Sequence, residues 1–360
     1  MGRATVLVTG VSGNLGLRLL PLLEDHEILG ADLYPPDLPQ PVHFVEMDFG
    51  KEESCRQLLV LLKQARPAAF VHLAFVIDPV RTGVLDEERM WQINVAGTAR
   101  VMEAISEANR DQVIVEKFLF PSSVSVYGSD FSEPAKEDFP LAAHTLPYAV
   151  HKMEAERVVQ QRAPALRGCS VYMFRPPIFA GASVENYLLG AFRGTPNGRG
   201  KAAVRMRAAG QRLPMMLPFG AQYLANKIQF VHVDDMARLL AYIVHKAEPE
   251  LQRLTVLNVA GRGEALTFAQ CIQMAHGRFW RVPGKWTLGL VLKLLWRYGI
   301  SAIPPAALPY ITGQYIMDTS NLQNFLGPDY AKVIRYTMAE AFADSFAAQP
   351  SPKLSVATGS

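Results

Sequence analysis

The segment TGVSGNLG, residues 9–16, places three glycines between an apolar run and a helical pattern. The run TVLVTG at 5–10 predicts a buried strand. The pattern NLGLRLLPLLEDH at 14–26 predicts the helix that follows it. A glycine triplet alone is a weak signal, but a strand before it and a helix after it are the context that a phosphate-binding loop requires. This feature limits the possible folds of the chain more than any other.

Each glycine of the loop has a separate physical task. Gly10 permits the tight turn, Gly13 lets the backbone approach a pyrophosphate, and Gly16 permits close packing of the helix on the strand. Backbone N–H groups at the start of the helix, at Asn14 and Leu15, would hold the anion. The loop therefore predicts a dinucleotide-binding unit.

Strands and helices alternate through the first half of the chain. The predicted strands are 5–10, 27–32, 68–74, 117–123 and 170–176, and the predicted helices are 14–26, 54–65, 91–109 and 148–162. Strands separated by helices of this length favour right-handed crossovers, and hence a Rossmann-like, doubly wound parallel sheet in an α/β protein.

The second half of the chain is less regular. We predict that residues 1–180 form the cofactor-binding domain, to which 228–261 returns as a strand end, a helix and a late strand. Residues 181–227 and 262–348 are predicted to form a smaller substrate-binding lobe. The polar tail at 349–360 is predicted to be disordered.

An acidic residue ends the second predicted strand. Asp32 lies 22 residues after Gly10, where a carboxylate would bind the adenosine ribose hydroxyls. Leu33, Tyr34 and Pro35 follow, with no Arg or Lys to neutralise a 2′-phosphate, which favours NAD over NADP.

Composition excludes several classes of protein. The 360 residues carry a formal net charge of only +3, which gives no bulk electrostatic argument for nucleic acid. The three cysteines (Cys55, Cys169 and Cys271) lie far apart, which predicts a reduced, cytoplasmic chain with neither disulfides nor a metal site. No secretory signal precedes the first strand, and no apolar run reaches the roughly 18 residues needed to span a bilayer.

The motifs together resemble the extended short-chain dehydrogenase/reductases, the group that includes the NAD-dependent epimerases and dehydratases. The resemblance covers roughly residues 5 to 345 and rests on eight segments in the order of the chain. They are TGVSGNLG, HLAF (72–75), NVAGT (94–98), PSSVSVYG (121–128), YAVHK (148–152), RPPIFAG (175–181), FVHVDD (230–235) and DTSNLQNFLG (318–327). The resemblance implies an NAD-dependent enzyme with a Rossmann-like fold.

Tyr148 and Lys152 supply the chemistry that such an enzyme requires. Oxidising a secondary alcohol requires a base that accepts the hydroxyl proton. A free tyrosine has a pKa near 10, so at neutral pH it stays protonated and is not a good base. A lysine one helical turn away, together with the positive nicotinamide, favours the phenolate. Ser123, at the end of a strand, would hydrogen-bond the reacting oxygen. Ser122 competes for that role, and the family pattern favours Ser123.

Further cofactor contacts follow from the resemblance and from strand ends. The resemblance implies that Asn94 supports the cofactor and the helix geometry, and that Lys152 also contacts the nicotinamide ribose. It implies that Leu73 and Ala74 supply backbone near the cofactor, while His72 is structural. Asp48 and Phe49 follow the third apolar run, where an acid would meet the adenine amino group, although a strand-end turn explains them almost as well.

The substrate is less well defined, because three phosphate contacts typical of nucleotide-sugar enzymes are missing. Ile178 stands where those enzymes usually carry Asn, and Ile228 stands where they often carry Arg. A later arginine is absent from the residues before DTS at 318–320.

Two other segments bear on the substrate. A basic stretch holds six cations and no acid between Phe192 and Leu213, and it is either an anion-binding lid over a phosphate or CoA-like group or a solvated loop. Residues 286–297 form an amphipathic pattern that would cover an apolar pocket, touch a membrane interface, or simply belong to the substrate lobe.

The sequence therefore predicts an NAD-dependent oxidoreductase acting on a secondary alcohol or ketone, with an apolar or weakly phosphate-like small-molecule substrate. One alternative is a nucleotide-sugar 4-epimerase with tightly bound NAD, and another is a non-catalytic NAD-sensing scaffold. The helices at 91–109 and 148–162 are candidates for a homodimer interface, as the resemblance implies.

Overall fold

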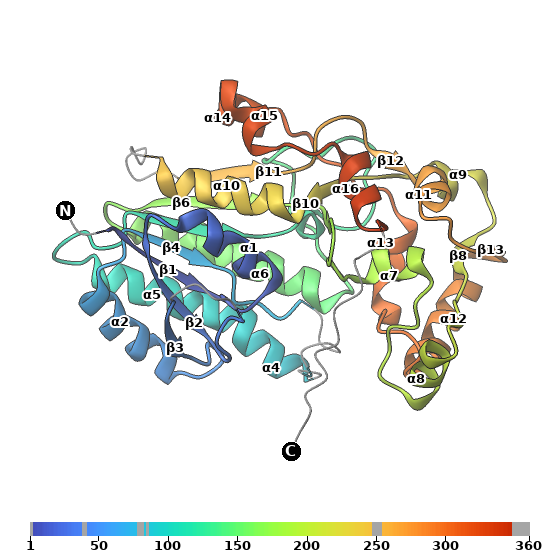
Figure 1. The fold of residues 1–360 in the computed structure, drawn as a ribbon, viewed down its shortest axis with the longest axis horizontal. Helices are drawn as coiled ribbons and strands as arrows, with labels where there is room; N and C mark the ends of the chain where they lie inside the picture. Colours follow the sequence, from blue (N-terminus) through green and yellow to red (C-terminus); the bar gives the residue numbers. More distant parts are fainter. Residues whose placement is uncertain (1–2, 38–41, 78–82, 84–85, 247–253, 348–360) are drawn as a thin grey trace, which may run out of the picture.

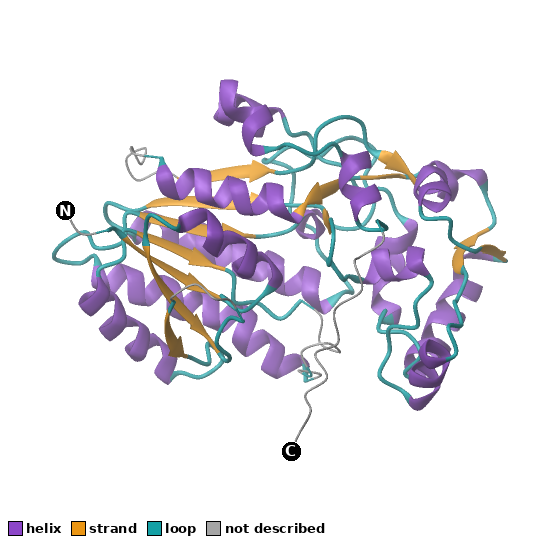
Figure 2. Ribbon diagram, viewed as in Figure 1, coloured by secondary structure: helices purple, strands orange, loops and turns teal. Residues whose placement is uncertain are grey.

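The computed structural model describes residues 3–37, 42–77, 83, 86–246 and 254–347. A parallel sheet of seven strands forms its centre, with helices on both faces (Figures 1 and 2). Across the sheet the strands are β3 (His43–Glu46), β2 (Glu27–Asp32), β1 (Thr5–Thr9), β4 (Ala69–His72), β5 (Lys117–Pro121), β6 (Ser170–Arg175) and β11 (Leu254–Asn258). This order confirms the predicted doubly wound fold. The prediction for the tail at 349–360 falls outside the described residues.

The central strands are buried on both faces, which explains their continuous apolar runs. In β1, Val6 and Val8 belong to the hydrophobic core on one side of the sheet, while Leu7 belongs to the core on the other side. Successive side chains of a strand point to opposite faces, so helices must cover both.

Two groups of helices provide that cover. Residues of α1 (Asn14–Leu19), α10 (Val233–His245) and α14 (Ser320–Leu326) complete one core, and residues of α2 (Glu53–Ala65), α5 (Gly97–Ala108) and α6 (Pro147–Arg162) complete the other. The sheet is therefore the middle of three layers, and β1 and β4 lie side by side where the strand order reverses. Ligands of open α/β sheets bind at the carboxyl ends of strands at such a reversal.

Two predicted helices are interrupted. The α-helix expected at 14–26 ends at Leu19 and continues as a 3₁₀ helix over Leu20–Leu23. Pro21 has no N–H with which to extend the α-helical hydrogen bonds. The helix expected at 91–109 consists of α4 (Glu87–Trp91), a π-helical turn over Gln92–Ala96, and α5. Single π-helical turns are often found at functional sites.

The remaining elements lie mostly beyond the carboxyl ends of the strands (Figure 1). Strand β10 (Phe230–His232) pairs with β7 (Ile178–Ala180) outside the main sheet, whereas β11 joins that sheet beside β6. The other helices are α7 (Tyr187–Arg193), α8 (Lys201–Ala208), α9 (Ala221–Ala225), α11 (Phe268–Met274), α12 (Gly284–Arg297), α13 (Leu308–Thr312), α15 (Tyr330–Val333) and α16 (Met338–Asp344). The other strands are β8 (Met215–Pro218), β9 (Lys227–Ile228), β12 (Leu266–Thr267) and β13 (Phe279–Val282). The domain division at residue 180 stays a prediction.

Candidate active site

The glycine loop follows β1 and packs against the segment that follows β4. Gly10 has a φ of +66°, and a Cβ atom there would lie 2.6 Å from the backbone nitrogen of Ala74. Only glycine permits both this conformation and this approach. The loop, including Gly13, Asn14 and Gly16, lines a cavity that reaches from the sheet into the smaller lobe.

Asp32 lies directly beside the loop. Its Oδ2 accepts hydrogen bonds from the Ser12 backbone N–H at 3.0 Å and from the Ser12 hydroxyl at 2.6 Å. Its Oδ1 accepts from the Leu33 N–H at 2.7 Å. A carboxylate is thus fixed next to a close-packed glycine loop, an arrangement that fits a dinucleotide with free ribose hydroxyls. Ser12 was not predicted, because a serine between glycines carries no distinctive signal.

Asp48 and Phe49 have other contacts. The carboxylate of Asp48 accepts a hydrogen bond from the Gly50 N–H at 3.0 Å and forms an ion pair with Arg89 of α4. Phe49 is buried, and its ring packs edge-on against the imidazole of His72. These contacts tie the end of β3 to the neighbouring helix, and an adenine contact at Asp48 stays a prediction.

His72 and Asn94 fix the segment that follows β4. The Nδ1 of His72 lies 2.7 Å from the Thr9 hydroxyl, and its Nε2 lies 3.2 Å from the Thr98 hydroxyl. Burial, with a smaller contribution from the charge of Lys152, lowers the pKa of His72 to about 3, so the imidazole is neutral. From the π-helical turn, Asn94 exchanges hydrogen bonds with both the N–H and the carbonyl of Val76. Leu73, between these anchors, lines the cavity.

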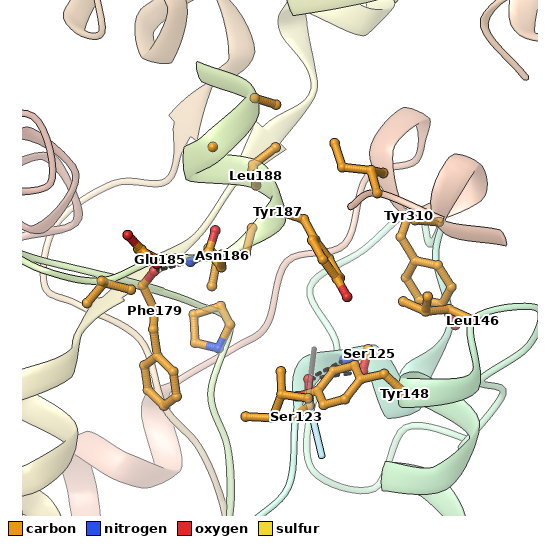
Figure 3. Close-up of a pocket in the computed structure, with 18 of the residues that line it drawn as sticks. Ser123, Ser125, Leu146, Tyr148, Phe179, Glu185, Asn186, Tyr187, Leu188 and Tyr310 are labelled. Atoms are coloured by element: carbon orange, nitrogen blue, oxygen red, sulfur yellow. Dashed lines mark hydrogen bonds between the residues drawn. The ribbon is translucent and has the colours of Figure 1, made fainter. Parts of the chain in front are cut away.

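Tyr148 and Lys152 lie on the first two turns of α6, after Pro147 at its first position. Both line the cavity together with Ser123, the residue that follows β5 by two positions. Figure 3 shows Tyr148 close to Ser123. Burial raises the pKa of Tyr148, and the hydrogen bond with the Ser123 side chain lowers it by less. The site therefore holds a protonated tyrosine until additional positive charge stabilises the phenolate.

Lys152 is almost fully buried. Its Nζ donates to the carbonyl of Pro121 at 2.7 Å and lies 3.6 Å from the centroid of the Phe75 ring. Burial lowers the pKa of Lys152 to about 7, although the charge of Glu156 opposes this shift. A lysine with such a pKa changes its protonation state near neutral pH.

The structure separates the two serine candidates. The Ser122 hydroxyl donates to Glu156 at 2.6 Å, and Glu156 forms a buried ion pair with Arg175. The Ser123 hydroxyl oxygen accepts from the N–H and the hydroxyl of Ser125, at 3.2 and 3.0 Å. Its own proton is then left to donate to another acceptor. Ser123 is thus better placed than Ser122 to hold a reacting oxygen.

The cavity has a volume of about 710 Å³. Beyond Tyr148 it is lined mainly by apolar and aromatic side chains of the smaller lobe, including Tyr187, Met216, Leu288, Leu292, Ile303 and Tyr310. Tyr187 and Tyr310 extend into the space above Tyr148 and Ser123 (Figure 3). Among the described lining residues, Lys152 is the only Lys or Arg and Glu185 the only Asp or Glu. The apolar lining of this lobe was not predicted in detail, because its residues come from segments without a regular pattern.

The positions where phosphate contacts are missing lie in different environments. Ile178 lines the cavity. Ile228 is buried and pairs with Leu266 in a small antiparallel sheet. Arg175 is buried against Glu156 and Tyr127 and does not line the cavity.

The predicted basic stretch between Phe192 and Leu213 does not supply its charges to the cavity. Its described cations are absent from the cavity lining, whereas Gly194, Thr195 and Asn197 of the same stretch contribute to it. Arg193 donates to the carbonyl of Ser345 at 2.7 Å, and Arg207 donates to the carbonyl of Gly198 at 2.8 Å. These two guanidinium groups hydrogen-bond backbone carbonyls of the lobe and so link its segments.

Comparison with known proteins shows the family of this chain. The model of the NAD dependent epimerase/dehydratase family matches residues 6–260, and the chain belongs to this family. Family membership confirms the predicted class of enzyme and its cofactor, NAD.

Two individual relatives share less than 30% sequence identity with the chain. The chain is 28% identical over 173 residues to a UDP-glucose 4-epimerase of Erwinia amylovora, covering 45% of this chain and 49% of that protein. It is 27% identical over 255 residues to UDP-glucose 4-epimerase 3 of Oryza sativa subsp. japonica, covering 65% of each. The match thus spans about half the length of the first relative and two thirds at most of the second.

The fold is also found in solved structures. The UDP-glucose 4-epimerase of Thermus thermophilus, in complex with NAD, superimposes with a TM-score of 0.65 at 18% identity, covering 95% of this chain and 97% of that one. At this identity the likeness shows the fold alone. In the part of the chain that the structure describes, every helix is too short or too polar to cross a membrane.

Proposed function

We propose that the chain is an NAD-dependent oxidoreductase that interconverts a secondary alcohol and a ketone on a substrate with a largely apolar body. The observation that carries the proposal is one continuous cavity, with the glycine loop at one end and apolar side chains at the other. Ser123, Tyr148 and Lys152 lie between these two ends.

The three residues divide the chemistry. NAD, when bound beside the glycine loop, would supply the acceptor for the hydride of the carbinol carbon. Tyr148 accepts the hydroxyl proton at its phenolic oxygen and returns it when the reaction runs toward the alcohol. The Ser123 hydroxyl donates to the reacting oxygen and holds it in place. Protonated Lys152 favours the phenolate of Tyr148, which burial alone disfavours. Asp32 and the glycine loop would hold the adenosine ribose and the pyrophosphate.

The apolar body of the proposed substrate is inferred from the scarcity of charged side chains among the described residues that line the cavity. A diphosphate buried against a protein is normally met by Arg or Lys side chains, because desolvating it unpaired is costly. Lys152 is the only such side chain among the described residues that line the cavity, and it faces Pro121 and Phe75. Apolar walls instead favour the body of a hydroxylated lipid, a steroid or a similar molecule.

Nucleotide-sugar 4-epimerisation is the second candidate, and the relatives named as UDP-glucose 4-epimerases favour it. Hydride would then leave and return on opposite faces of one carbon, with no net release of NADH. Among the described residues that line the cavity, Lys152 is the only cation, which weighs against this candidate.

One experiment separates these candidates. The purified protein is incubated with NAD and a panel of hydroxysteroids, long-chain secondary alcohols, CoA esters and UDP-sugars, and both NADH and sugar epimers are measured. We expect NADH formation with an apolar alcohol and a loss of about 10³-fold in turnover for Tyr148→Phe, without loss of NAD binding. The matched control is Tyr242→Phe on α10, because the Tyr242 hydroxyl contacts Asp329 and the residue is outside the cavity lining.

The other results would each contradict part of the proposal. Epimer formation from a UDP-sugar without NADH would establish the second candidate. NAD binding without turnover, and unchanged in Tyr148→Phe, would indicate a non-catalytic NAD-sensing protein.

A further inference from the structure

Six large apolar side chains are exposed at the end of the smaller lobe that lies farthest from the sheet. The most exposed are Trp286 at 79%, Tyr298 at 64%, Trp280 at 62% and Phe219 at 57% of their full surface. Leu290 and Leu294 are exposed at 44% and 45%. They belong to β13, α12 and the turns beside them, which lie at the edge of the molecule in Figure 1. Exposed apolar groups in one region usually mark an interaction site.

Helix α12 is apolar on two opposite faces. Leu288, Leu292 and Leu295 face inward and line the cavity. Trp286, Leu290 and Leu294 are exposed, and at 100° per residue they fall on the opposite side of the helix. The same helix therefore separates the active-site cavity from the exterior and presents apolar side chains to both.

The charges around this face all have one sign. Residues 186–233 and 265–317, which supply α7 to α9, α11 to α13 and strands β8 to β10, β12 and β13, contain twelve Lys or Arg and no Asp or Glu. Because the whole chain has 36 Lys and Arg and 33 Asp and Glu, the remainder carries a net charge of −9. Arg281, Lys285, Lys293 and Arg297, on β13 and α12, are all exposed.

We propose that this face, named the α12 face and comprising Phe219, β13, α12 and Tyr298, docks on an anionic lipid bilayer. Exposed Trp and Leu beside Lys and Arg, with no acids nearby, is the composition that binds the interfacial region of membranes. A protein partner would also be met by hydrophobic contact, but residues 186–233 and 265–317, which contain cations and no acid, match a uniformly negative surface better than a mixed one. Docking would bring the wall of the apolar cavity to the lipid phase, from which an apolar substrate would enter. Only this last step depends on the proposed function.

The test measures binding without NAD or substrate, so its outcome is independent of catalysis. The full chain is sedimented with phosphatidylcholine vesicles, with and without phosphatidylglycerol, at low and high salt. We expect binding only to the anionic vesicles, weakened by salt. The emission of the exposed Trp280 and Trp286 should shift to the blue on binding.

Variants separate the two contributions. Trp280→Ser/Trp286→Ser should weaken vesicle binding roughly tenfold or more. Lys293→Gln/Arg297→Gln should weaken it roughly twenty-five-fold, since each cation near the surface contributes about fivefold. The matched control is Val60→Gln/Lys63→Gln, which removes one exposed apolar and one exposed cationic side chain from α2.

Three results would overturn the proposal. The first is no sedimentation with anionic vesicles, and the second is equal vesicle binding by the control and the α12-face variants. The third is self-association of the protein through this face instead of vesicle binding. Self-association would be seen as a dimer in light scattering that Trp280→Ser/Trp286→Ser converts to a monomer.

Discussion

The sheet half and the smaller lobe handle polar groups in opposite ways. In the half of the molecule built on the sheet, charged side chains such as Lys152, Glu156 and Arg175 are buried and hydrogen-bonded. The lobe instead buries apolar side chains around the cavity and leaves most of its cations at the surface. Precise chemistry requires fixed polar groups, which must be buried with partners. A wall for an apolar molecule requires only shape and apolar surface, so the lobe needs no paired polar groups there.

The largest expected effect comes from breaking the buried ion pair of the sheet half. Arg175→Met leaves Glu156 buried without its partner and should lower the free energy of unfolding by about 3–5 kcal/mol. Urea denaturation followed by circular dichroism measures this loss. The double variant Arg175→Met/Glu156→Leu should recover most of it. A single variant as stable as the wild type would show that the pairing is unimportant.

Lys152 gives the next effect, in the opposite direction. Burial lowers its pKa from 10.5 to about 7, so between these values the unfolded chain holds a proton that the folded chain lacks. The free energy of unfolding should therefore rise with pH across this window and be lowest near and below pH 7. Lys152→Met should remove this slope and stabilise the ligand-free protein by a few kcal/mol at the acid end, because a difference of one in pKa corresponds to about 1.4 kcal/mol. Unfolding curves of both proteins from neutral to alkaline pH, converging as pH rises, provide the check.

Variants of Ser122 and Ser123 distinguish a serine that takes part in the reaction from one that stabilises the fold. Ser123→Ala should reduce kcat by about 10²-fold, because its hydroxyl is free to donate to the reacting oxygen. Ser122→Ala should leave kcat nearly unchanged and cost about 1–2 kcal/mol, because Glu156 loses a donor. Steady-state kinetics and urea denaturation of both variants decide the assignment, and a reversed pattern would make Ser122 the catalytic serine.

A variant of Asp32 tests the predicted binding of NAD beside the glycine loop. Asp32→Ala should weaken NAD binding roughly tenfold, since a ribose contact to a charged acceptor contributes about 1.5 kcal/mol. NADP should lose its disadvantage, because no carboxylate would then oppose a 2′-phosphate. Isothermal titration with each cofactor measures both changes. Equal affinity of the wild type for NAD and NADP would refute the selectivity.

The smallest effect is expected at the exposed cations of the lobe. Arg205→Gln/Arg212→Gln should change the free energy of unfolding by less than about 0.5 kcal/mol and leave turnover of a water-soluble substrate unchanged. Both side chains are exposed and outside the cavity lining. A large rise in KM for a phosphate-bearing substrate would instead support the interpretation of the basic stretch as an anion-binding lid.

Much of the sheet half was predictable because its signals are local. Strand β2 has the predicted bounds Glu27–Asp32, and the predicted strands match β1, β4, β5 and β6 to within two residues at each end. Buried parallel strands must be apolar on both faces, and the helices between them must be amphipathic, so short windows are sufficient. The π-helical turn around Asn94 was not predictable, since it depends on the backbone of Val76, eighteen residues away.

The sequence by itself determined the glycine loop, the strand-end position of Asp32, and the one-turn spacing of Tyr148 and Lys152. These features depend on backbone geometry over a few residues, which local residue types specify. Only the tertiary structure decided that the Ser122 hydroxyl donates to Glu156 while the Ser123 hydroxyl is left to donate to a ligand, that Arg175 is paired with Glu156, and that the lobe surrounds the site with apolar walls. Which way a side chain points is settled by packing between segments distant in sequence, and no short pattern records that packing.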